Sequence, residues 1–495
     1  MSEKYVIILG AGPAGLAVGH ELTANKEKVV VLEKQSFVGG LCRTIQSQGY
    51  RFDLGGHRWF TKNESLNEWF RQLMADEIVM VNRISRIYYK RKYFFYPIQI
   101  GNIIKETGFL TIIHAGITFV WSMLKQSVVK TPIVNMEQAY KAQFGSKLYD
   151  MFFRRYTEKV WGLPCTELSS DWVSQRSKGL SIWSILHEAL IGGNEKKYTS
   201  LIDEFMYPRF GYVRVPERMA EDIVARGCEI KTSTAVSKII YHGENDLEVF
   251  YKSGDQELSE RGSDVVSTIP MNYLAKIIEP ACDESVIEAC DALSFRALIT
   301  VNVMIHKKQV SKDTWLYVQD ENVIFGRLHE PKNWSPDMVK DDDHTSLVLE
   351  CFCSVGDEIW SMSDDDIAQR CLRDLVDKLK FITDEEYDGA SVIRTYHAYP
   401  VYDLDYLKNT TVIKEYLAKF KGLHIVGRGG THRYNNSDHS VEMGLLLGQK
   451  ILGQNVDHLS VNTENDYQEI IGENDEYRPI YQFNSAKDKA ESVNE

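Results

Sequence analysis

Alternating stretches of apolar and polar residues divide the chain into the strands and helices of an α/β protein. Residues 4–9 (KYVIIL) form a short apolar run, and residues 28–34 (KVVVLEK) form another. A glycine-rich turn and a stretch of helical character, ending near Asn25, separate the two runs. Strand, helix and strand in this order predict a βαβ unit.

Helical spacing dominates from about residue 100 to 205, where Trp, Leu and Ile recur every three to four positions. Strand patterns then return at residues 229–238, 247–251, 264–269, 295–305, 345–352 and 423–426, and a helix is expected from about 439 to 452. Residues 88–97 (YYKRKYFFYP) predict a hairpin whose basic turn is more typical of a solvated tip than of a nucleic-acid site.

The segment from 108 to 124 (GFLTIIHAGITFVWSML) carries no formal charge over 17 residues. That length lies near the lower limit for a membrane span. Two Gly, two Thr, a His and a Ser interrupt its apolar character. The pattern therefore favours a buried or surface-docked helix, and contact with a membrane is the less favoured alternative.

The length and net charge of the chain limit the classes of protein to which it can belong. A chain of 495 residues exceeds one ordinary hydrophobic core, so two or three domains are expected. The net charge is −13, and residues 460–495, with nine acidic and three basic residues, account for −6 of it. This balance argues against a nucleic-acid partner. An anionic ligand would need a local cluster of arginines.

Eight cysteines are scattered along the chain without a CxxC pair or a zinc-ligand spacing. No metal site and no disulfide framework is expected, which favours a reducing compartment. The sequence begins MSEK and enters a strand without an apolar leader, so a cytoplasmic location is expected.

The glycine-rich turn has the spacing GxGxxG, formed by Gly10, Gly12 and Gly15 between the first strand and its helix. The first glycine permits a tight turn, the second lets a pyrophosphate approach the backbone, and the third packs the helix on the strand. Glu33 ends the second strand, where a carboxylate can hold ribose hydroxyls. The motif predicts a dinucleotide site without separating NAD from FAD.

Further motifs follow in a fixed order: Gly39-Gly40-Leu41-Cys42-Arg43, then Gly55-Gly56-His57, then residues 264–270 (DVVSTIP) and 427–444 (GRGGTHRYNNSDHSVEMG). This order resembles the FAD proteins of the glutathione-reductase type, in the branch with amine oxidases, protoporphyrinogen oxidases and UDP-galactopyranose mutases. The resemblance implies FAD contacts from Gly10, Gly12, Gly15, Glu33, Gly39, Gly40, Arg43, Gly55, Gly56, Val236, Gly427, Arg428, Asp438 and Ser440.

The fold class implied is α/β, with a Rossmann-like FAD-binding domain, an inserted helical domain and a mixed or antiparallel sheet domain. We expect the FAD-binding domain at residues 1–97, 209–290 and 415–455. The helical domain is expected at 98–208, the sheet domain over the flavin at 291–414, and an acidic tail at 456–495.

Within that branch, further segments resemble UDP-galactopyranose mutases: residues 55–60 (GGHRWF), 96–99 (YPIQ), 156–162 (YTEKVWG), 171–176 (DWVSQR), 325–327 (FGR) and 399–400 (YP). The resemblance implies catalytic roles for His57, Arg176, Arg327 and Arg428. It implies substrate contacts from Phe60, Tyr96, Gln99, Trp161, Tyr317, Trp334, Tyr399, Tyr434 and Asn436. The mutase family has Tyr in place of Trp334.

The implied reaction is a pyranose–furanose interconversion of a nucleotide-diphosphate sugar, in which N5 of the reduced flavin attacks the anomeric carbon without net redox. Guanidinium groups suit the diphosphate, and aromatic rings suit the sugar. NAD(P)H is a candidate external reductant, and a homo-oligomer is compatible with the resemblance. The alternative is an FAD-dependent oxidase or dehydrogenase of the amine oxidase or protoporphyrinogen oxidase type. The flavin-binding motifs are equally compatible with this activity.

Overall fold

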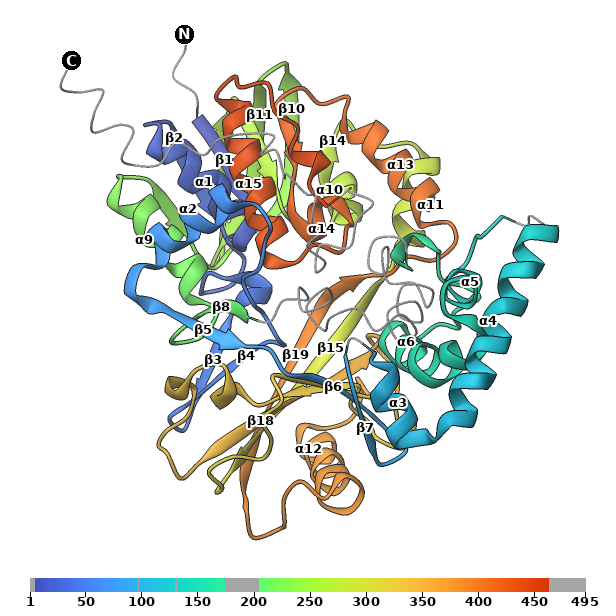
Figure 1. Cartoon of the computed structure of the whole chain (residues 1–495). Helices are drawn as coiled ribbons and strands as arrows, with labels where there is room; N and C mark the ends of the chain where they lie inside the picture. The colour runs from blue at the N-terminus through green and yellow to red at the C-terminus, as the bar shows by residue number, and fades with distance from the viewer. Residues whose placement is uncertain (1–4, 97, 130–131, 174–203, 463–495) are drawn as a thin grey trace, which may run out of the picture.

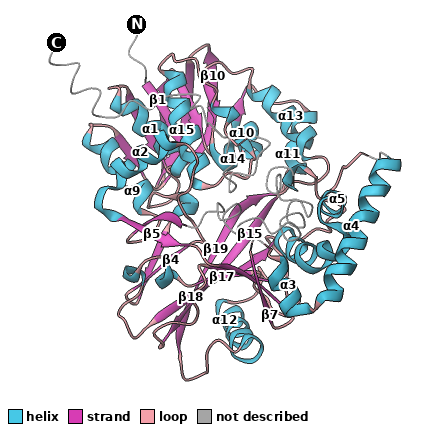
Figure 2. Ribbon diagram, in the orientation of Figure 1, coloured by secondary structure: helices cyan, strands magenta, loops and turns pink. Residues whose placement is uncertain are grey.

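The computed structural model describes residues 5–96, 98–129, 132–173 and 204–462. Two sheet-containing lobes stack on each other, and a group of helices packs beside the lower lobe (Figure 1). The strands of the two lobes and the helices around them are distinguished by colour in Figure 2. Arg176, one of the predicted catalytic residues, lies outside the described residues.

The upper lobe contains a parallel sheet in the order β20-β13-β1-β2-β9. Its strands are β1 (Tyr5–Leu9), β2 (Lys28–Leu32), β9 (Glu229–Lys231), β13 (Asp264–Ser267) and β20 (Leu423–Ile425). Helices α1 (Pro13–Ala24), α9 (Arg214–Ala225) and α15 (Ser437–Ile451) belong to the core on one face. Because both faces of the sheet are buried, its strands read as continuous apolar runs.

A second sheet covers the other face, in the order β12-β11-β10-β14. Its strands are β10 (Thr234–Gly243), β11 (Asp246–Ser253), β12 (Gln256–Gly262) and β14 (Ile278–Glu279). Helices α10 (Met271–Ile277), α11 (Glu284–Ala292) and α13 (Tyr406–Leu417) share the same core. On β1, Val6 and Ile8 pack toward the helices, whereas Ile7 and Leu9 pack toward this second sheet.

The lower lobe is a seven-stranded sheet in the order β19-β15-β18-β17-β16-β6-β7, antiparallel except for the β16–β6 pair. Its strands are β6 (Ser85–Tyr89), β7 (Lys92–Phe95), β15 (Phe295–Ile305), β16 (Trp315–Val318), β17 (Arg327–His329), β18 (Thr345–Cys353) and β19 (Tyr387–Pro400). Helix α12 (Asp364–Arg373) packs on one face. The predicted hairpin at 88–97 is therefore part of this sheet and not of the FAD-binding lobe, so the expected boundary at residue 97 does not follow the strand pairing.

The helical group comprises α3 (Ile100–Thr107), α4 (Phe109–Val129), α5 (Met136–Leu148) and α6 (Arg154–Trp161). The connecting elements are α2 (Glu64–Met74), α14 (Gly427–Thr431), and the ribbons β3 (Thr44–Ser47) with β4 (Tyr50–Asp53) and β5 (Ile78–Asn82) with β8 (Glu204–Pro208). Shorter 3-10 and π-helical turns span Gly40–Cys42, Ala75–Glu77, Tyr149–Phe153, Pro331–Asn333, Pro336–Met338, Asp374–Leu379 and His458–Ser460.

The uncharged segment at 108–124 lies in α4, which docks on α5 through Ala115 and Phe119. Of the predicted buried or surface-docked helix, the structure shows the surface-docked form, because most of its large apolar side chains face solvent. Within the described ranges, no helix has both the length and the apolar character needed to cross a membrane.

Candidate active site

The glycine-rich turn leaves room for a ligand at the N-terminus of α1. Gly10 has φ +103°, and a Cβ there would lie 2.2 Å from Thr268 Oγ1. A Cβ on Gly15 would lie 2.2 Å from the Gly10 carbonyl oxygen, which explains how helix and strand approach so closely. A Cβ on Gly12, in contrast, would meet no described atom within 4 Å. That open position, beside helix N–H groups, fits a pyrophosphate.

Glu33 and the second glycine pair complete this site. The Glu33 carboxylate accepts hydrogen bonds from the amides of Ala11 (2.7 Å) and Gln35 (2.8 Å), which fixes it beside the turn. Gly39 has φ +111°, and a Cβ on Gly40 would lie 3.3 Å from the Gly12 Cα. The two glycine turns are therefore folded against each other.

Arg43 follows the second glycine pair and stacks on Phe37, with its Cζ 4.3 Å from the ring centroid. Its Nε is buried and has no hydrogen-bond partner among the described atoms. Buried donors are rarely left unpaired in native proteins. An orphaned guanidinium donor beside an open glycine turn fits a phosphate of a bound dinucleotide.

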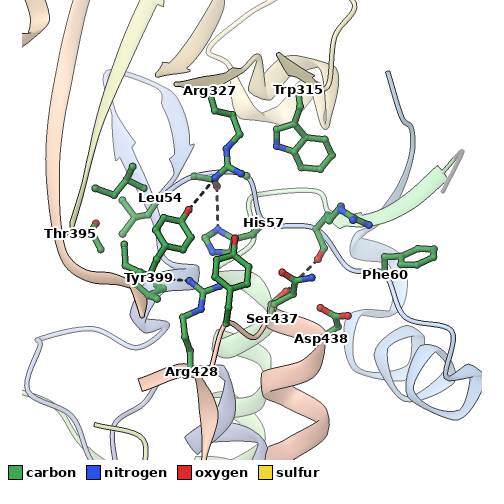
Figure 3. A pocket seen from close by; sticks show the side chains of 18 of the residues that line it. Leu54, His57, Phe60, Trp315, Arg327, Thr395, Tyr399, Arg428, Ser437 and Asp438 are labelled. Carbon is green, nitrogen blue, oxygen red and sulfur yellow. Dashed lines mark hydrogen bonds between the residues drawn. The ribbon is translucent and has the colours of Figure 1, made fainter. Parts of the chain in front are cut away.

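A pocket lies between the two lobes, beside the Gly55-Gly56 turn (Figure 3). Residues predicted to contact flavin or substrate that line it are Gly55, Gly56, His57, Phe60, Tyr317, Arg327, Tyr399, Arg428, Tyr434, Asn436 and Asp438. They come from the N-terminal segment, the seven-stranded sheet, α14 and the residues that lead into α15. The fold thus brings together residues nearly 400 positions apart in the sequence.

Arg327 on β17 is held by a buried ion pair. Its Nε lies 2.8 Å from Glu350 Oε1, and its Nη2 donates to Glu350 Oε2 and, at 3.0 Å, to the hydroxyl of Tyr399. Glu350 is fully buried on the adjacent strand, directly opposite Arg327 in the β17–β18 register. Arg327 Nη1 has no hydrogen-bond partner within the described chain, so one edge of the guanidinium remains available to the pocket.

Arg428 enters the pocket from α14, between two tyrosine rings. Its guanidinium donates to the backbone carbonyls of Asn435 (3.0 and 2.7 Å) and Ala398 (2.8 Å). Its Cζ lies 5.4 Å from the ring centroid of Tyr399 and 5.0 Å from that of Tyr434. These contacts fix the orientation of Arg428, and no carboxylate in the described part of the chain forms an ion pair with it.

His57 is a neutral imidazole at the wall of the pocket. Burial, with the positive charges of Arg428 and Arg327, lowers the pKa of His57 to about 3. Its Nδ1 lies 3.2 Å from the Gly55 carbonyl oxygen, and because that oxygen can only accept, Nδ1 carries the hydrogen. Nε2 is therefore an acceptor at physiological pH.

Several predicted substrate residues lie behind or beside the pocket instead of lining it. Trp161 is buried and packs against Tyr399 and Tyr434, with ring centroids 6.4 and 6.3 Å apart. Trp334 is also buried, and its Nε1 donates to the Thr314 carbonyl at 3.1 Å, so it is not a pocket residue in this structure.

Tyr96 and Gln99 lie at the entrance to α3, where Tyr96 packs on Tyr317 (5.4 Å) and Gln99 is exposed. The Ser440 hydroxyl donates to the Asn436 carbonyl (3.0 Å) within α15. Val236 is half-buried on β10, two residues after Thr234, whose amide donates to the Glu33 carbonyl (2.8 Å). These residues do not line the pocket.

Other pocket residues were missed from the sequence: Arg58, Arg83, Trp315, Thr395 and Ser437. Arg58 directly follows His57 in the GGHRWF motif, so its place in the motif was a usable signal. Arg83 and Trp315 belong to no recognised motif. The pairing of β16 with β6 brings their segments together.

A parallel sheet with this glycine turn, and a second glycine pair folded against it, define a dinucleotide-binding flavoprotein fold. The chain belongs to the flavin-containing amine oxidoreductase family, whose model matches residues 13–427. Membership implies FAD as the cofactor, and the open Gly12 position and the orphaned Arg43 donor fit it. Glu33 would hold the ribose, and the start of α1 the pyrophosphate.

Relatives at the sequence level fall into different activity classes. A probable UDP-galactopyranose mutase of Klebsiella pneumoniae is 26% identical over 174 residues, which is 34% of this chain and 44% of the relative. A phytoene desaturase of Fusarium fujikuroi is 24% identical over 258 residues, 48% of this chain and 44% of the relative. The matched regions therefore span less than half of either relative.

Among solved structures, reduced UDP-galactopyranose mutase superposes with a TM-score of 0.79 at 19% identity, covering 93% of this chain and 98% of that one. A putative protoporphyrinogen oxidase from Exiguobacterium gives a TM-score of 0.70 at 16% identity, covering 92% and 100%. These likenesses establish the predicted α/β flavoprotein fold.

Proposed function

We propose that this chain is a flavin-dependent mutase acting on a nucleotide-diphosphate sugar. The observation that carries the proposal is the charge of the pocket. Among the described residues, four arginines, namely Arg58, Arg83, Arg327 and Arg428, line it with a single carboxylate, Asp438. The lining of this pocket is therefore positively charged, although the net charge of the whole chain is −13. Guanidinium groups bind phosphate through charge-assisted hydrogen bonds, so a diphosphate is the ligand that suits this pocket.

The described side chains have separable tasks in such a reaction. Arg327 Nη1 and the guanidinium of Arg428 would stabilise the negative charge that develops on a departing diphosphate. Tyr399 and Tyr434 stack at 5.4 Å with an interplanar angle of 11°, and their rings would exclude water beside Arg428. A bound reduced flavin would supply the nucleophile, as the resemblance to the mutases implies.

Neutral His57 would act as a hydrogen-bond acceptor through Nε2. An imidazolium in its place would add a third positive charge beside Arg327 and Arg428, and the low pKa of His57 opposes this. His57 is thus suited to orient a donor on the cofactor or the sugar. It is not suited to act as a proton donor at neutral pH.

A second candidate is an oxidoreductase for a neutral substrate. It is favoured by the Arg327–Glu350 pair, because Glu350 already compensates one pocket arginine, and by the desaturase among the relatives. Such an enzyme would transfer hydride to the flavin and would need an electron acceptor. Its pocket would have no need of the remaining three arginines.

Ligand binding separates the two candidates. Purified flavin-loaded protein is titrated with UDP and with uridine, and the flavin absorbance and fluorescence are recorded. The mutase proposal expects a saturable change with UDP and at least a tenfold weaker response to uridine. Arg327→Lys, which removes the planar guanidinium, should weaken UDP binding. Arg261→Lys, an exposed arginine paired with Asp246 on the second sheet, is the matched control. Absence of any UDP response, with flavin reduction by a neutral substrate, would favour the oxidoreductase.

A further inference from the structure

Helix α4 presents an apolar surface to solvent along its length. At its ends, Leu110 and Val128 are 80% and 81% exposed, and Trp121 between them is 70% exposed. The outward apolar residues are Phe109, Leu110, Ile113, Ile117, Val120, Trp121, Met123, Leu124 and Val128. A helix of 21 residues is about 30 Å long. Contiguous apolar surface of this extent is unusual on a monomeric protein and marks an interaction site.

The polarity of α4 is inverted relative to an ordinary surface helix. Thr111, Thr118 and Ser122 are half-buried, on or beside the side that faces α5, together with buried Ala115 and Phe119. The Thr118 hydroxyl donates to the Ala115 carbonyl and accepts from the Lys147 amide. The hydroxyl of Thr118 is thus satisfied within the protein, and most of the large apolar side chains are left outside. Figure 2 shows α4 at the outer edge of the molecule, away from both sheets.

Exposed basic residues lie near both ends of this apolar face. Residues 90–129 contain five basic residues and one acidic residue, a net charge of +4 in a chain whose total is −13. The exposed hairpin turn at Lys90 and Arg91 lies near the start of α4, because Lys92 Nζ donates to the Glu106 carbonyl. Lys125, also exposed, lies on the last turns of α4.

We propose that α4 is a docking element that lies in the surface of an anionic lipid bilayer. An exposed apolar helix face with Trp, flanked by Lys and Arg, is the combination that binds such a surface. The exposed Ile133 and Val134, just beyond α4, extend the apolar face. Docking is peripheral, because no described helix can cross a membrane. A second copy of the chain fits less well, since a symmetric contact through α4 would bring two faces flanked by Lys and Arg together.

The test is flotation of the full-length, flavin-loaded protein with vesicles of phosphatidylcholine alone or with 30% phosphatidylglycerol. We expect binding to the anionic vesicles, at least tenfold stronger than to phosphatidylcholine, and weakened by 0.5 M NaCl. Ile117→Glu and Trp121→Glu should each reduce binding at least tenfold while leaving flavin content unchanged. Leu407→Glu, an apolar residue 58% exposed on α13, is the matched control and should bind like the parent protein.

Three results would overturn the proposal. One is no binding to either vesicle, and another is equal binding by Ile117→Glu and the parent protein. The third is vesicle binding that Leu407→Glu weakens as much as Trp121→Glu does, which would place the lipid contact elsewhere than on α4. Light scattering without lipid adds a further check. If the parent protein is a dimer that does not bind vesicles, and Ile117→Glu converts it to a monomer, the apolar face of α4 is a contact with a second copy of the chain.

Discussion

Replacing Glu350 with Gln probes the buried ion pair that holds Arg327 in the pocket. The substitution keeps the shape of the side chain and removes its charge, so Arg327 loses the partner of a two-point contact. Breaking a buried pair from one side costs about 3–5 kcal/mol, because the remaining charge is uncompensated. Since 17% of the Arg327 side chain is exposed, we expect about 3 kcal/mol, the lower end of that range.

Urea unfolding of flavin-loaded protein at pH 7 measures this cost, within a cycle of Glu350→Gln, Arg327→Gln and the double variant. We expect the double variant to lose at least 2 kcal/mol less stability than the sum of the single variants, as is typical of groups that interact directly. Additive losses, or a loss below about 1 kcal/mol for Glu350→Gln, would refute the assigned role of the pair.

The same variant should bind UDP more tightly, because Glu350 no longer offsets the charge of Arg327. A unit charge about 6 Å from the ligand changes the energy by roughly 0.7–3 kcal/mol for effective dielectric constants of about 80 to 20. We therefore expect about a tenfold lower dissociation constant. Weaker binding of UDP to Glu350→Gln would contradict the placement of the diphosphate beside Arg327.

Three further changes test other parts of the account. Gly15→Ala places a Cβ 2.2 Å from the Gly10 carbonyl, so the purified protein should contain much less flavin, as judged from the ratio of absorbance at 450 and 280 nm. The pKa of His57 is about 3 in the folded protein and about 6.5 in the unfolded chain. As the pH falls below about 6.5, the unfolded chain therefore takes up a proton at His57 that the folded protein does not, and the unfolded state is favoured. Stability should therefore decrease from pH 7 to pH 5 in urea titrations, and less steeply in His57→Gln. Tyr207→Phe removes the 2.7 Å hydrogen bond to Asp53, whose pKa burial raises to about 6, and should cost about 1–3 kcal/mol in the same assay.

The strands of the FAD-binding lobe could be predicted because they are buried on both faces. Continuous runs such as residues 4–9 and 264–269 are unambiguous, and they coincide with β1 and β13. Strand β19, at residues 387–400, was not predicted. Its residues are mostly half-buried and include Gly389 and several polar side chains, so no alternation of apolar and polar residues identifies it.

The pocket was predictable where residues belong to compact motifs, as His57 and Arg428 do. Glu350 was not predictable, because it lies within an apolar run on β18 and meets Arg327 only through the strand register. Trp334 shows the converse. It lies in a recognisable motif, yet its ring fills the space behind Gly56, where a Cβ would meet it at 3.1 Å. A motif fixes the order of residues along the chain, and packing decides which of them reach a cavity.

Turnover under anaerobic conditions tests the proposed activity most directly. The protein is reduced with dithionite, incubated with a panel of UDP-, dTDP- and GDP-hexopyranoses, and the products are separated by chromatography. We predict a new peak of the same mass as one substrate, formed only when the flavin is reduced, and strongly diminished in Arg327→Lys but not in Arg261→Lys. No isomerisation with any nucleotide sugar, together with oxygen-dependent oxidation of an amine or another neutral substrate, would contradict the mutase proposal.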